Sequence, residues 1–77
     1  MASKAEQQIC IAEAVRFYET DGRAVVIRGG AGETPGAIIA PLLSYLSTCR
    51  CLSQSEMFAC AGIALDIQLG LRQSGAN

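Results

Sequence analysis

The side chains best suited to metal or redox chemistry in this 77-residue chain are four cysteines, whereas histidine is missing altogether. Cys49 and Cys51 are two positions apart, so on a helix their thiols would point about 200° away from each other and could share no metal ion unless the helix had already ended. The paired CxxC spacing of zinc ribbons and zinc fingers does not occur. Cys10 and Cys60 fall on apolar arcs, where a free cysteine behaves as a small hydrophobic residue. We predict no metal site and no cofactor, and we expect all four thiols to be reduced in a cytoplasmic protein.

General acid–base catalysis has few candidate residues in this chain. Without histidine the commonest general base is missing. The carboxylates of Glu13 and Asp66 lie on the polar sides of their predicted helices, where a solvated charge is usual, and Ser44 and Ser47 have no base nearby on their helix. A domain of this size seldom builds a water-excluding pocket alone. We therefore predict no catalytic residues and no enzymatic activity.

A glycine-rich loop is the second candidate site. Residues 28–36, RGGAGETPG, carry the spacing Gly-x-Gly-x-x-x-Gly between a β-branched run and an apolar segment. This order resembles the glycine fingerprint of dinucleotide-binding proteins, in which backbone N–H groups and a helix N-terminus hold phosphate. The resemblance implies an anion site formed by Arg28, Gly30, Gly32 and Thr34.

Other features of this loop favour a structural turn. Glu33 places a negative charge where phosphate would sit, Pro35 has no N–H to donate, and no lysine follows the glycines as it does in a phosphate loop. A dinucleotide-binding fold also needs several strands, and this chain offers one candidate. We interpret the loop as a turn whose glycines take positive φ and whose Thr34 caps the next helix. The alternative is a nucleotide or phosphate site that is completed where the loops of two subunits meet.

Three helices must position these residues. The motifs SKAE, starting at Ser3, and SQSE, starting at Ser53, match the capping box and predict helices over residues 3–20 and 53–72. Threonine followed by proline predicts a third helix over residues 35–50. Pro41 lies inside that helix and is expected either to kink it or to move its start to Ala40-Pro41.

Between the first two helices, the sequence predicts one short extended segment. Asp21-Gly22 is expected to end the first helix, and the following residues 24–28, AVVIR, are β-branched and bounded by glycines. The run predicts a strand, with a loop or one helical turn as the alternatives. A lone strand leaves an unpaired edge, which favours pairing with a second chain.

Composition also favours an oligomer and excludes two classes of partner. Apolar residues make up 51% of the chain and charged residues 17%, well below the roughly 25% of an average domain. The net charge of −1, with scattered cations, argues against nucleic acid. The longest uncharged run, residues 34–49, is too short and polar to span a membrane, and MASKAEQQ does not read as a secretory signal.

The predicted helix over residues 53–72 is apolar on nearly all sides, which leaves one arc without an intramolecular partner. We predict a mostly α fold: one compact three-helix domain over residues 1–77, with one short extended segment, that is an obligate homo-oligomer, a dimer or higher. The predicted interface residues are Val25, Ile27, Phe58, Ala61, Leu65 and Leu69. The predicted function is an inhibitor- or adaptor-like regulatory module that binds another protein, and the alternative is a nucleotide or phosphate binder that uses the loop over residues 28–36.

Overall fold

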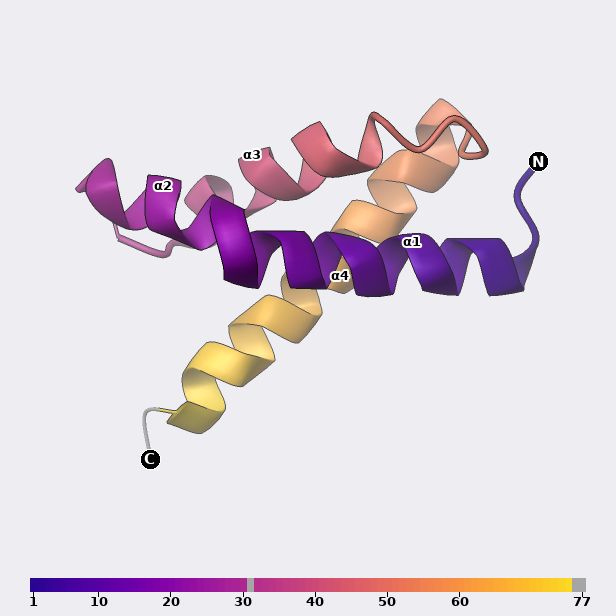
Figure 1. The fold of residues 1–77 in the computed structure, drawn as a ribbon. Helices are drawn as coiled ribbons and strands as arrows, with labels where there is room; N and C mark the ends of the chain where they lie inside the picture. Colours follow the sequence, from indigo (N-terminus) through magenta and orange to yellow (C-terminus); the bar gives the residue numbers. More distant parts are fainter. Residues whose placement is uncertain (31, 76–77) are drawn as a thin grey trace.

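The computed structural model describes residues 1–30 and 32–75, and in this part of the chain the regular structure is helical, with no strand. Its elements, in chain order, are α1 (Lys4–Phe17), η1 (Tyr18–Gly22), α2 (Arg23–Arg28), α3 (Pro35–Leu46) and α4 (Gln54–Gly75). The elements α1, η1 and α2 follow one another without a break and form one helical rod, which we call the first rod. The helices α3 and α4 are the other two rods of the described chain. Figure 1 shows α1 and α3 running roughly alongside each other while α4 crosses both on a diagonal. The prediction of a compact, mostly helical fold with three helices is confirmed.

The predicted strand over residues 24–28 is wrong, because these residues lie in the short helix α2. The predicted helix end at Asp21-Gly22 is also wrong, since the chain continues through the π-helical turn η1 into α2. A β-branched run favours a strand only where another strand can pair with it, and the described residues contain none. As a helix, the segment satisfies its own backbone hydrogen bonds.

Gly22 is a point of close contact between the first rod and α3. A Cβ atom added at Gly22 would lie 3.0 Å from Cβ of Pro41 and 3.2 Å from Cδ1 of Tyr18. The residue is buried and its φ of −65° is helical. Glycine at this position therefore lets two helices approach each other, and it does not act as a helix stop.

The predicted starts of the helices are confirmed. Ser3 and Glu6 form a reciprocal capping box at α1, and Ser53 and Glu56 do the same at α4. The hydroxyl of Thr34 accepts from the N–H of Ala37, so α3 begins at Pro35 and not at Ala40.

The helix α3 ends at Leu46, four residues before the predicted end. The hydroxyl of Ser47 donates to the carbonyl of Ser44 over 2.7 Å, and that of Thr48 donates to the carbonyl of Tyr45 over 2.6 Å. Short polar side chains that bond to nearby carbonyls compete with continuation of a helix. The two cysteines that follow therefore lie in the loop between α3 and α4.

The core lies where α4 crosses the other two rods. Its fully buried members are mostly small or aliphatic: Ala14, Tyr18, Ile38, Leu42, Leu46, Cys60 and Ala64. Gln68 is buried among them, and its Nε2 donates to the carbonyl of Val15 over 3.3 Å, which ties α4 to α1 just before the π-helical turn. Among the helices of residues 1–30 and 32–75, none combines the length and the apolar character needed to cross a membrane.

Candidate functional site

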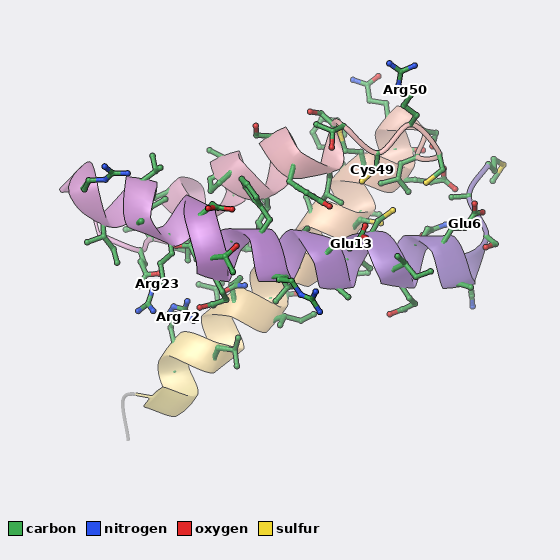
Figure 2. All side chains as sticks on the ribbon, in the orientation of Figure 1. Glu6, Glu13, Arg23, Cys49, Arg50 and Arg72 are labelled. Atoms are coloured by element: carbon green, nitrogen blue, oxygen red, sulfur yellow. The ribbon has the colours of Figure 1, made fainter. Side chains whose placement is uncertain are left out.

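The carboxylate of Glu33 joins the loop before α3 to the first helical rod and to α4. Its Oε1 accepts hydrogen bonds from the hydroxyl of Tyr18 over 2.8 Å, from Nε of Arg23 over 3.0 Å and from Nε of Arg72 over 3.2 Å. These donors belong to η1, α2 and α4. Figure 2 shows the side chains of Arg23 and Arg72 converging between α2 and the C-terminal half of α4. We call Glu33 and its three donors the Glu33 cluster.

The pKa values in this cluster follow from burial and from the paired charges. Burial alone would raise the pKa of Glu33, but the hydrogen bonds from Arg23, Tyr18 and Arg72 outweigh it and hold that pKa below its ordinary value. Burial, and then the hydrogen bond to Glu33, raise the pKa of Tyr18 to about 12. Burial would lower the pKa of Arg72, yet its bonds to Glu19 and Glu33 raise it. Glu33 and Arg72 are therefore an ion pair at neutral pH.

The glycine-rich loop is built around this cluster and has the geometry of a turn. Gly30 and Gly32 have φ values of +81° and +80°, a region that favours glycine, and Thr34 caps α3. Arg28 is exposed at the end of α2 and makes no ion pair within the described residues. The other cations near the loop, Arg23 and Arg72, are bound by the protein's own carboxylate, so in one copy they have little capacity for an external anion.

The structure brings together two cysteines that are far apart in the sequence. Sγ of Cys10 on α1 lies 3.8 Å from Sγ of Cys51 in the loop between α3 and α4. Cys10 is 5% exposed, whereas Cys51 lies at the surface. Cys49 is half-buried in the same loop, where Figure 2 labels it, and Cys60 is fully buried. Within residues 1–30 and 32–75, no three metal-ligating side chains are placed so that they could hold a metal ion.

The predicted interface residues of α4 occupy different environments. Ala61 is 1% exposed and belongs to the core, and Leu65 and Leu69 are partly buried against it. Phe58 is 53% exposed. On α2, Val25 and Ile27 are both more than half exposed. Of the six residues, Phe58, Val25 and Ile27 are therefore the ones that a partner could reach easily.

A second set of apolar residues on α4 is exposed along one side of the helix. Ile63, Ile67 and Leu71 expose 48%, 42% and 49% of their surface, and Ala59 is also exposed. These four residues are spaced four apart, so they form one continuous row, which we call the α4 ridge. Figure 1 shows that the C-terminal half of α4 extends beyond α1 and away from α3. The interface predicted from the sequence did not include Ile63, Ile67 and Leu71, because only the crossing of the helices decides which side of an apolar helix is covered.

A groove of about 330 Å³ lies on the surface between the first rod and α3. It is lined by charged, polar and aromatic residues: Glu13, Arg16, Phe17, Thr20, Asp21 and Tyr45. The rings of Phe17 and Tyr45 stack with centroids 5.1 Å apart and form one wall. Burial, and then the negative charge of Glu13, raise the pKa of Tyr45. The groove is open to solvent.

Comparison with protein-family models, curated proteins and solved structures finds no match to this chain.

Proposed function

We propose that the protein is a non-catalytic protein-binding module that acts as a homodimer, and that two copies pair through the α4 ridge. The observation that carries this proposal is the exposure of Ile63, Ile67 and Leu71 in one row. Single exposed apolar residues are ordinary on a protein surface, but a contiguous apolar strip is typical of a surface that binds another protein.

The uncharged side chains of the ridge and their spacing favour another helix as its binding partner. No member of the ridge is charged, and each lies four residues from the next along α4. Rows of this spacing form the ridges that pack into the grooves of another helix in the commonest class of helix–helix contact. An amphipathic helix that lays its apolar face against α4 would remove the three large side chains from water.

The ridge of one copy can pair with the same ridge of a second copy, which makes a second copy the preferred partner. A twofold axis through its midpoint would place Ile63 beside the partner subunit's Ile67, so that one surface supplies both halves of the contact. A standard interface buries about 800 Å² per subunit, which is about a sixth of the 4842 Å² surface of this chain. The ridge would form the apolar centre, and neighbouring polar residues would form the rim.

The low charge of the chain is consistent with this proposal. Charged residues are only 17% of the sequence, and eight large hydrophobic residues are exposed in the described part of the chain. Small domains bury a modest fraction of their apolar surface within one copy, and oligomerisation is a common way to bury more.

The experiment that tests the location of the interface is a matched pair of substitutions. Ile67→Glu places a charge at the centre of the ridge, and Ile9→Glu makes the same change at an isoleucine of α1 that is 58% exposed. We expect sedimentation velocity to show that the Ile67→Glu protein is monomeric and that the Ile9→Glu protein still dimerises. Equal behaviour of the two variants would contradict a role for the ridge, and circular dichroism checks that both remain helical.

A further inference from the structure

We infer that Cys10 and Cys51 are the site of a reversible intramolecular disulfide, formed by exchange with a low-molecular-weight disulfide such as glutathione disulfide. This inference is independent of the proposed dimer, because it concerns two thiols within one copy of the chain.

The geometry of the two thiols is the first support for this site. Their sulfur atoms are 3.8 Å apart although the residues are separated by 41 positions, and a disulfide requires about 2.05 Å. Cys51 lies in the loop that joins α3 and α4, outside both helices. A small movement of this loop toward α1 would close the gap without breaking the hydrogen bonds of a helix.

The unequal exposure of the two thiols fits the two steps of thiol–disulfide exchange. Cys51 is at the surface and can meet a reagent in solution, whereas Cys10 is 5% exposed and is reached only from within the protein. An exposed attacking thiol beside a protected second thiol is the arrangement in which a mixed disulfide is resolved internally.

The disulfide would form in two thiol–disulfide exchange steps. The Cys51 thiolate attacks one sulfur of glutathione disulfide, which forms a Cys51–glutathione bond, breaks the S–S bond of the reagent and releases one glutathione thiolate. The Cys10 thiolate then attacks the Cys51 sulfur, which forms the Cys10–Cys51 bond and releases the second glutathione. The protein loses two electrons and two protons, and one glutathione disulfide becomes two glutathione molecules. Excess reduced glutathione reverses both steps.

The remaining cysteines are less suited to this pairing. Cys60 is fully buried, so a reagent in solution does not reach it in the folded protein. Cys49 lies in the same loop as Cys51 and is half-buried. Cys51 makes the sulfur–sulfur contact of 3.8 Å with Cys10. Burial raises the pKa of the Cys10 thiol, and Cys49 also lies near enough to raise it, so replacing Cys49 tests whether Cys51 is the residue that pairs.

The disulfide would couple the stability of the fold to the redox potential of its surroundings. Linking two residues that are 41 positions apart restricts the unfolded chain much more than the folded one. For a domain of this size we expect the melting temperature of the oxidised protein to exceed that of the reduced protein by roughly 10 °C or more.

The sequence allows each cysteine to be located without ambiguity. Cleavage after Lys and Arg together with cleavage after Glu places each cysteine in its own peptide: residues 7–13 for Cys10, 34–50 for Cys49, 51–56 for Cys51 and 57–72 for Cys60. The full chain is equilibrated with glutathione disulfide and the exchange is stopped with acid. The remaining thiols are then alkylated in denaturant, so that the buried Cys60 also reacts, and the digest is analysed by mass spectrometry. We expect peptides 7–13 and 51–56 to be linked and the other two cysteines to be alkylated.

Two variants complete this test. Cys51→Ser removes an exposed thiol and should abolish both the linked peptides and the rise in melting temperature, whereas Cys49→Ser should leave both unchanged. Alkylation of all four thiols after oxidation, a link from Cys49 to Cys10 or to Cys51, or a link between two chains on a non-reducing gel would each overturn the inference. A stable Cys51–glutathione adduct without the internal link would also overturn it.

Discussion

Glu33 and Arg72 are separated by 39 positions in the sequence, and a hydrogen bond of 3.2 Å joins their side chains and fixes the loop before α3 to the C-terminal half of α4. The side chains of Glu33 and Arg72 are only 18% and 21% exposed, so water screens this ion pair less than it would a pair at the surface. The same carboxylate holds Tyr18 and Arg23. We therefore expect Glu33 to be the residue through which the loop contributes to stability.

Replacing this carboxylate tests that expectation. Glu33→Gln keeps the size of the side chain but removes its charge. It leaves Arg23 without its counter-ion, whereas Arg72 keeps its ion pair with Glu19. We expect the free energy of unfolding at neutral pH to fall by about 1–3 kcal/mol, measured by urea denaturation. Asp66→Asn is the matched control, because Asp66 is exposed on α4 and forms no ion pair within the described residues. Equal effects of the two substitutions on the free energy of unfolding would show that the Glu33 cluster does not stabilise the fold.

The same ion pair predicts how stability depends on pH. The pKa of Glu33 in the folded protein lies below the ordinary value of 4.5. Between these two pKa values the unfolded chain binds more protons, so stability rises with pH there. The contribution of Glu33 is complete above about pH 4.5 and is lost as the pH falls through the folded pKa. Melting curves of the wild-type and Glu33→Gln proteins should therefore converge on acidification, and a constant difference down to acidic pH would contradict the assignment.

The raised pKa of Tyr18 predicts a second effect of pH on stability, under alkaline conditions. Burial, and then the bond to Glu33, raise the pKa of Tyr18 to about 12 from its ordinary value of 10.0. The unfolded protein loses this proton first, so stability should decline as the pH rises from about 10 toward 12. A spectrophotometric titration of tyrosinate should show an ionisation near pH 12 that is missing in Tyr18→Phe, while the ionisation of Tyr45, whose pKa is also raised, remains. Ionisation of both tyrosines at the ordinary pKa would rule out this environment.

The two glycines Gly22 and Gly62 should respond in opposite directions to the same substitution. In a helix, alanine is ordinarily more stable than glycine by roughly 0.5–1 kcal/mol. At Gly62 a new Cβ meets nothing within 4 Å, so Gly62→Ala should stabilise the protein. At Gly22 it would lie 3.0 Å from the rigid ring of Pro41, so Gly22→Ala should destabilise it by about 1–2 kcal/mol. Thermal unfolding measures both changes, and stabilisation by Gly22→Ala would contradict the close packing of the two helices.

The sequence alone identified the local signals of this fold but not its long-range contacts. Both capping boxes and the cap at Thr34 depend on residues within four positions, and the structure confirms them. The prediction of a strand over residues 24–28 was wrong because strand formation depends on a partner strand elsewhere in the chain. The close approach of Gly22 to Pro41 could not be predicted either, because no local sequence pattern indicates it.

In the candidate site too, the local features were predicted from the sequence and the long-range contacts were not. The turn at Gly30 and Gly32 was predicted from glycine chemistry and has the expected positive φ. Glu33 was recognised only as an obstacle to phosphate, since its donors come from η1, α2 and α4 and can be found only once the helices are placed. The early end of α3, which brings Cys51 to Cys10, could have been suggested by the cluster of Ser47 and Thr48.

The central claim is that two copies of this chain associate through the α4 ridge. Sedimentation equilibrium of the wild-type protein under reducing conditions, from low micromolar to millimolar concentration, tests it most directly. We predict that the average mass rises with concentration toward twice the monomer mass of 8.1 kDa, and that Ile67→Glu prevents this rise. A mass that stays at 8.1 kDa throughout the range would contradict the claim.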